Sequence, residues 1–183
     1  SGDGGGSFLL SSLDYYYERG TISSFMQSYL GVSDMTNDRV ELDPVGNAGN
    51  PVGGGLGPYS MVRPDDYAVY WPADGGQGPF NDYVNAAPGA DEPFRFSTTA
   101  HNNSTNLDGG AWRTVFYAWP VEWIDTVGQR AEVLGQALSW LCSANAPGVR
   151  LEPPSNRATA NQASRPFTWW TSITWWATTR PST

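Results

Sequence analysis

A strand that leads directly into an amphipathic helix, within residues 112–142, limits the folds open to this chain more than any other feature. Residues 112–119 (WRTVFYAW) are β-branched and aromatic with no charge after Arg113, which is typical of a buried strand. Residues 125–142 (DTVGQRAEVLGQALSWLC) begin at a cap of Asp125 or Thr126 and repeat apolar side chains every three or four positions. A buried strand followed by such a helix indicates an α/β fold. We expect the helix to bury one face, made of Val127, Ala131, Leu134, Leu138 and Leu141.

The earlier part of the chain predicts shorter elements separated by turns. Residues 7–12 (SFLLSS) form an apolar run bounded by Gly and Ser, which predicts a buried strand. Residues 21–31 (TISSFMQSYLG) predict a helix of about two to three turns that starts at a Ser or Thr cap and ends at a glycine. For the rest, we expect short strands or a β-excursion over 33–63, a loop over 64–92, a strand over 93–100 and a turn-rich connection over 101–110.

Length and charge restrict the partners of the chain. The 183 residues suggest about one domain. All ten basic residues are arginines against eighteen acids, and this net charge of −8 argues against nucleic acid and against anionic membrane surfaces. No apolar run of about 18 residues occurs, so we expect no membrane insertion. The single Cys142 excludes an intrachain disulfide framework.

The composition changes after about residue 145. A Pro-containing, linker-like stretch leads to a tail with four tryptophans, so the expected division is residues 1–145 as one domain and 146–183 as linker and tail. A docked extended tail, an unstructured tail and a mis-assigned C-terminus stay open as alternatives. If the tail docks, we expect residues 167–177 to cover the open side of the sheet, because an unpaired strand edge promotes association.

Several blocks resemble a known family in their order along the chain: GGGSFLLSSLDYYYERG, SSFMQSYLGVSDMTND, NPVGGGLGPYSM, DGGAWRTVFYAWPVEWI and QRAEVLGQALSWL. Together they resemble the second half of a class I glutamine amidotransferase-like domain, in the form found as an accessory module of large secreted bacterial proteins such as immune inhibitor A type metallopeptidases. The resemblance covers roughly residues 4–142 and implies a flavodoxin-like three-layer α/β sandwich. Such domains have two or three βα units before the GGGS strand. We therefore expect either a fragment or a shortened sheet that the 33–100 region, the tail or a partner chain completes.

The same resemblance implies that no catalytic residue is present. Catalytic relatives have a His-Pro-Glu type motif after the last strand of the site, and its histidine activates a cysteine on a sharp strand-to-helix turn. Here Trp119 matches the histidine, Pro120 is kept and Glu122 is displaced by one position. The turn after residues 7–12 contains Ser11, Ser12 and Asp14 but no cysteine, and we expect Cys142 to be a small core residue.

Other candidate acids and bases favour structural roles. His101 is the only histidine and is predicted to be a solvated loop residue. The pairs Asp65 with Asp66 and Glu122 with Asp125 are more typical of turns and caps than of acid–base catalysis. An oxygen-rich cluster makes calcium the one cofactor to consider, although the EF-hand spacing is absent. Its candidate ligands are Asp34, Asp38, Glu41 and Asp43.

Tryptophans supply the candidate binding surface. Exposed indoles can present apolar area with a polar tip to a glycan, whereas Trp119, Trp123 and Trp140 are expected to pack in the core. We therefore expect a non-catalytic accessory or interaction module of a secreted or cell-surface bacterial protein, whose partners are neighbouring domains or a second copy. A carboxylate-based hydrolase or peptidase-associated activity and a carbohydrate-binding module are the alternatives. The candidate glycan-binding residues are Trp71, Trp112, Trp169, Trp170, Trp175 and Trp176.

Overall fold

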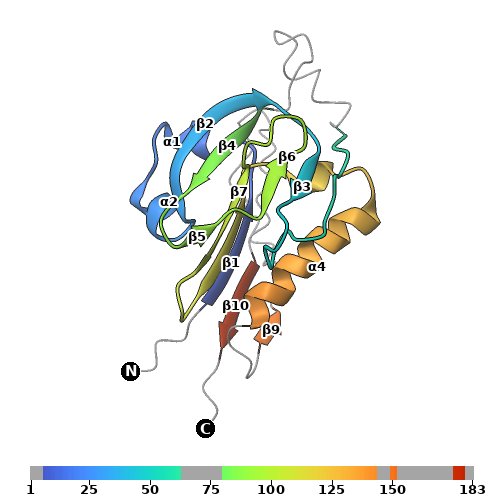
Figure 1. Ribbon diagram of the computed structural model, residues 1–183. Coiled ribbons are helices and arrows are strands. Elements are labelled where there is room, and N and C mark those ends of the chain that lie inside the picture. The colour runs from blue at the N-terminus through green and yellow to red at the C-terminus, as the bar shows by residue number, and fades with distance from the viewer. Residues whose placement is uncertain (1–5, 63–79, 144–148, 152–174, 180–183) are drawn as a thin grey trace, which may run out of the picture.

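The computed structural model describes residues 6–62, 80–143, 149–151 and 175–179, which form a mixed α/β structure (Figure 1). The helices are α1 (Tyr15–Arg19), α2 (Ser24–Ser28), the single-turn 3₁₀ helix η2 (Val121–Trp123) and α4 (Val127–Ser143). The strands are β1 (Gly6–Ser11), β2 (Val32–Val40), β3 (Pro44–Gly46), β4 (Phe80–Ala86), β5 (Ala90–Asp91), β6 (Phe94–Phe96), β7 (Ser104–Asp108), β8 (Arg113–Tyr117), β9 (Val149–Leu151) and β10 (Trp175–Thr179).

A six-stranded sheet with the order β5-β7-β8-β1-β10-β9 is the largest unit within the described residues. Its central pair, β1 and β8, is parallel, with Leu9 opposite Val115. The other neighbours in this sheet pair antiparallel. Two antiparallel ribbons, β2 with β4 and β3 with β6, complete the β-structure.

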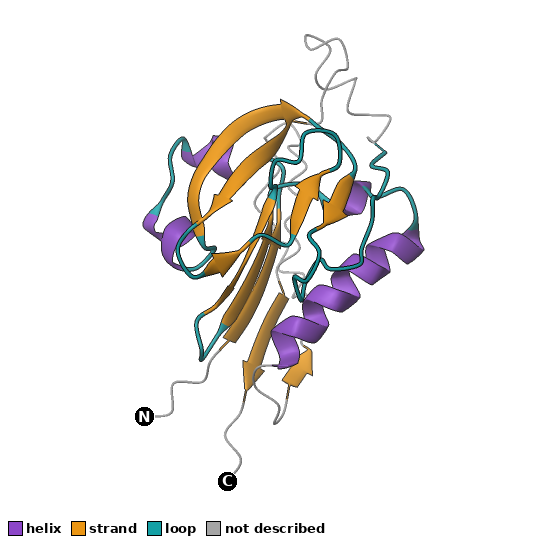
Figure 2. Cartoon of the chain, in the orientation of Figure 1, coloured by secondary structure: helices purple, strands orange, loops and turns teal. Residues whose placement is uncertain are grey.

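The parallel pair is covered on both faces, as Figures 1 and 2 show. On one face, Leu9 and Val115 belong to the core that contains the buried side chains of α4. On the other face, Leu10 and Phe116 pack in a second core, to which α2 contributes Met26. Adjacent residues of a strand point to opposite faces, so the apolar runs in β1 and β8 supply both cores.

The strongest expected elements, β8 and α4, are confirmed, but the buried line of α4 differs from the expected one. Val133, Ala137 and Leu141 are buried, whereas Val127 is 72% exposed, Ala131 is exposed, and Leu134 and Leu138 are only partly buried against the core. The helix packs against two partners rather than one. Besides the sheet, it contacts the 51–59 segment, where the Gln136 side chain donates to the Pro51 and Gly54 carbonyls. The fully buried line runs through Val133, Ala137 and Leu141 at steps of four, one position before the expected Leu134 and Leu138.

Three strands form where the sequence predicts loop and turn. β4 and the short β5 lie within 64–92, and β7 lies within 101–110. β4 pairs with β2, and β7 pairs with β5 and β8. β4 and β7 bury polar side chains, including Asp82 of β4 and Thr105 of β7. Their sequences therefore lack the alternation of apolar and polar residues that predicts a strand. The expected helix over 21–31 is shortened to α2, and the chain turns away at Gly31, which adopts a positive φ of 68°.

The tail joins the sheet next to β1. β10 pairs antiparallel with β1 on the side away from β8, with Leu9 opposite Trp175, and β9 pairs with β10. Docking of the tail on the open side of the sheet is thus confirmed for residues 175–177, while 167–174 lie outside the described residues. Because of this pairing, β1 is an interior strand and its backbone groups are paired on both sides.

In the described part of the chain, no helix has the length and hydropathy needed to span a bilayer.

Candidate functional site

The carboxyl ends of β1 and β8 meet at the place where open α/β sheets bind ligands. The Ser11 hydroxyl donates to the Trp119 carbonyl at 2.8 Å and accepts from the Val121 amide at 3.0 Å. The Ser12 amide donates to the Tyr117 carbonyl at 3.0 Å. The turn after β1 is therefore tied to the chain after β8. Ser11 is buried, so its hydroxyl serves this junction and is not presented to a substrate.

Trp119, which the sequence resemblance aligns with a catalytic histidine, is fully buried beside this junction. Its indole stacks on Tyr117 with 4.9 Å between ring centroids and meets Phe94 edge to face at 5.6 Å. Its ring nitrogen donates to the Asn103 side-chain oxygen at 3.1 Å. An indole is a donor only, so this position packs the core and cannot accept a proton from a nucleophile. Trp123 is also buried and Trp140 is partly buried against the core, which confirms their expected packing.

A buried carboxyl group lies next to the same strand ends. Asp82 of β4 is 1% exposed, its amide donates to the Ala118 carbonyl, and one of its carboxyl oxygens accepts from the Asp38 amide at 3.2 Å. Its other oxygen has no hydrogen-bond partner among the described residues. Burial, aided by the nearby carboxylates of Asp38 and Asp14 and partly opposed by the hydrogen bond from the Asp38 amide, raises the pKa of Asp82 to about 8. Asp82 therefore holds a proton at neutral pH, but a substrate cannot reach it.

Asp14 extends this acidic group toward the turn after β1. Burial, together with the charges of Asp38 and Glu18, raises the pKa of Asp14. Asp38 lies in a bulge of β2 and adopts a left-handed φ of 58°. The sequence pointed to Asp14 and Asp38 but missed Asp82, because the polar segment around it predicts a loop and gives no sign of burial.

The four candidate calcium ligands are not brought together. Asp34 and Asp38 lie in β2, Asp43 follows it, and both carboxylate oxygens of Glu41 accept from hydroxyl groups. The donors are Tyr83 at 2.9 Å and Thr98 at 2.5 Å. Among the residues that the structure describes, no group of three or more His, Cys, Asp or Glu side chains is placed to hold a metal ion.

His101 is exposed, as expected, but it is not an isolated loop residue. Its ring stacks on Tyr83 with 4.1 Å between centroids and an interplanar angle of 15°, and the Arg39 guanidinium lies 5.5 Å from the same Tyr83 ring. Tyr83 also donates to Glu41. The histidine therefore covers a strand side chain and stabilises the β2–β4 ribbon.

The remaining acid and thiol candidates that the structure describes lie in or beside η2 and α4. Cys142 is a free, half-buried thiol near the end of α4. Glu122 is in η2, and Asp125 precedes α4 with its amide donating to the Ser60 carbonyl. Thr126, rather than Asp125, caps α4 by accepting from the Gln129 amide. The pair Asp65 and Asp66 lies outside the described residues.

One aromatic surface does form, and it includes one of the predicted tryptophans. We call it the aromatic row: Phe8 of β1, Phe25 and Tyr29 at α2, and Trp112 before β8. Phe25 is 40% and Tyr29 is 50% exposed, and Phe8 and Trp112 are half-buried. Trp175 and Trp176 lie in β10, and Trp71, Trp169 and Trp170 lie outside the described residues.

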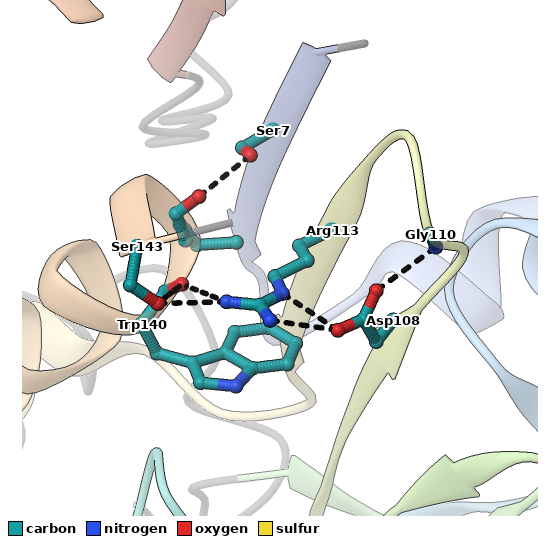
Figure 3. Close-up of polar contacts among 7 residues, drawn as sticks. Ser7, Asp108, Gly110, Arg113, Trp140 and Ser143 are labelled. Carbon is teal, nitrogen blue, oxygen red and sulfur yellow. Dashed lines mark hydrogen bonds and ion pairs between the residues drawn. The ribbon is translucent and has the colours of Figure 1, made fainter. Parts of the chain in front are cut away.

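At the amino end of β8, away from the junction of Ser11 with Trp119, polar contacts around Arg113 form a clamp (Figure 3). The guanidinium pairs with Asp108 at 2.8 Å and donates to the Trp140 carbonyl and the Ser143 hydroxyl, each at 2.7 Å. It also lies over the Trp140 ring, 4.8 Å from its centroid. Because Arg113 binds Asp108 of β7 and the last residues of α4, this cluster fastens the end of α4 to β7 and β8.

Comparisons of the chain with protein-family models, curated proteins and solved structures give no match. Function is therefore inferred from the residues and their geometry.

Proposed function

We propose that this chain is a non-catalytic interaction module of a larger secreted or cell-surface bacterial protein, built on a flavodoxin-like core of the glutamine amidotransferase type. The observation that carries the proposal is the burial of Trp119 between Tyr117 and Phe94, with its ring nitrogen held by Asn103. Catalytic relatives need a general base at this position, and this chain has a packed indole there instead.

The arrangement of the central elements supports the flavodoxin-like part of the proposal. β8 leads through η2 into α4, and α4 packs on the sheet beside the parallel strand β1. α2 packs on the other face. Strands β7 and β10 flank the parallel pair antiparallel to it, which departs from the all-parallel sheet of that fold.

The position of the thiol supports the absence of a cysteine mechanism. The Ser7 hydroxyl donates to the Leu141 carbonyl at 2.9 Å, so Cys142, the next residue of α4, adjoins the amino end of β1. Trp119 is joined to Ser11 at the carboxyl end of the same strand. Four residue steps of extended chain separate Ser7 from Ser11, about 13 Å. Cys142 is thus too far from the strand-end junction to act there.

A hydrolase that uses carboxylates is the alternative, and the raised pKa of Asp82 is the observation in its favour. The burial of Asp82 argues against this role, because a general acid must come within hydrogen-bond reach of the substrate. The interaction module is therefore the function that the geometry supports better.

Activity assays on the purified chain test the proposal. We expect no ammonia release from glutamine and no hydrolysis of p-nitrophenyl acetate or of a casein substrate above the buffer rate. Cys142→Ala and Asp82→Asn are assayed in parallel. Turnover by the unmodified chain that either substitution abolishes would show that the module is an enzyme and would refute the proposal.

A further inference from the structure

The aromatic row is continuous from β1 to the turn before β8. The ring centroids are 6.3 Å apart for Phe8 and Phe25, 5.5 Å for Phe25 and Tyr29, and 5.3 Å for Tyr29 and Trp112. Each ring therefore touches the next, and the two central rings are the most exposed. Phe25 and Tyr29 are four residues apart in α2 and at its end, which places them on the same side of the helix.

Buried hydroxyl groups hold the row in place from below. The Thr105 hydroxyl donates to the Leu30 carbonyl at 2.5 Å, and the Thr114 hydroxyl donates to the Tyr29 carbonyl. These bonds fasten the end of α2 to β7 and β8. A surface that is already ordered loses little conformational entropy when it binds a ligand.

The indole at the end of the row is seated on a glycine. A Cβ atom added at Gly109 would lie 2.2 Å from the Cε2 atom of Trp112, so only glycine leaves room for the ring in this position. The Gly109 amide also donates to the Trp112 carbonyl at 2.9 Å. The turn between β7 and β8 is thus shaped around Trp112.

The chemistry of the row points to an uncharged ligand. α2 contains no Asp, Glu, Lys or Arg, and its exposed residues besides Phe25 are Ser24, Gln27 and Ser28. A polyanion or an anionic membrane would require basic groups that neither the row nor α2 has. The cores of protein interfaces are also enriched in Tyr, Trp and Phe, but they are depleted in serine, which supplies two of the three other exposed residues of α2. Aromatic faces beside hydroxyl and amide groups match the apolar faces and hydroxyls of sugar rings.

We infer that the aromatic row binds a neutral polysaccharide, with Tyr29 and Trp112 stacking on sugar rings and Ser28 and Gln27 hydrogen-bonding to their hydroxyl groups. This inference rests on the proposed function, because it names the ligand class of the interaction module. In this inference Trp112 has the binding role that the sequence predicts for it, and among the described residues its ring contacts Tyr29.

Retention on insoluble polysaccharides tests the inference, with microcrystalline cellulose, chitin and starch granules as the probes. We expect the chain to be retained by at least one of them, equally at low and at high salt because no ion pair is involved. Tyr29→Ala and Phe25→Ala should each lower the affinity about tenfold. Both positions are largely exposed, and circular dichroism checks that each variant is folded. Tyr17→Ala is the matched control, since Tyr17 of α1 is 63% exposed but lies outside the row; it should bind like the unmodified chain.

Three results would overturn the inference: no retention on any of the three polysaccharides, retention that the row variants leave unchanged, or an equal loss in Tyr17→Ala. A fourth is a change in oligomeric state on substitution of Tyr29 without polysaccharide binding, which would make the row a contact between two copies. Failure of the inference is separable from failure of the proposed function. A chain without turnover and without retention loses only the ligand class, whereas turnover of glutamine or ester refutes the module itself.

Discussion

The ring nitrogen of Trp119 and the side-chain oxygen of Asn103 form a hydrogen bond of 3.1 Å between two fully buried residues. Asn103 begins an N-x-S/T sequence, as does Asn102, but both asparagine side chains are engaged inside the fold: Asn102 donates to Glu92. In the folded chain, Asn103 therefore connects the start of β7 to the residues after β8, and Asn102 connects it to Glu92 between β5 and β6. The bond also explains how an indole is accommodated at the end of β8, since its only polar atom is satisfied.

Removing the acceptor should destabilise the fold. In Asn103→Ala, the Trp119 nitrogen stays buried without a partner, which costs about 1–3 kcal/mol of unfolding free energy. Urea denaturation followed by tryptophan fluorescence measures the loss. Asn85→Ala, at an exposed position of β4, should change stability by less than about 0.5 kcal/mol. Equal stability of the two variants would mean that the Trp119–Asn103 bond has no energetic role.

Asp82 should make the stability of the fold pH-dependent. Its pKa is 3.8 in the reference state and about 8 in the fold, so between these values the folded state binds more protons than the unfolded state. Stability then falls as the pH rises from about 4 to about 8 and levels off above that range. Asp82→Asn cannot ionise and should be more stable than the unmodified chain at alkaline pH, with a flatter profile. Urea denaturation between about pH 5 and pH 9 measures both; parallel profiles for the two proteins would contradict the assignment.

The Arg113 clamp should depend on the shape of the guanidinium as well as on its charge. Arg113→Ala removes hydrogen bonds to Asp108, Trp140 and Ser143, and we expect a loss of about 1.5–3 kcal/mol. Arg113→Lys keeps the charge but cannot reproduce the planar fork, so it should recover only part of the loss. Asp108→Asn should cost less, about 0–1 kcal/mol, because the Asp108 side chain is 44% exposed. Thermal unfolding ranks the three variants, and a full rescue by lysine would show that charge alone matters.

The sequence predicts the elements whose own residues decide their structure, and it misses those that distant contacts create. β1, β8 and α4 follow from apolar runs and helical spacing. β7 does not, because Thr105 and Asn106 are polar and are buried only through neighbouring strands. In the helix predicted over 21–31, the spacing groups Phe25 and Tyr29 with Met26 and Leu30 as one apolar set, yet only Met26 and Leu30 pack in the core.

The candidate site divides in the same way. Ser11 and Trp119 are found from the sequence because the family resemblance aligns each with a site position at the end of a strand. The raised pKa of Asp82 depends on burial by β2 and on carboxylates far away in the chain, which no local pattern reveals.

The pairing of β10 with β1 gives the last prediction. Ala177 lies between two strands, opposite Ser7 of β1 and Leu151 of β9, so a proline at this position loses a backbone donor and cannot fit an interior strand. Ala177→Pro should release β10 and expose the edge of β1, and an unpaired edge next to apolar side chains promotes association. We expect lower stability in urea and a shift to larger species in size-exclusion chromatography with light scattering. Ala177→Val is the control, because valine suits a strand and keeps the backbone donor. If the proline variant is as monomeric and as stable as the valine variant, β10 does not protect β1, and another segment or the solvent must satisfy that edge.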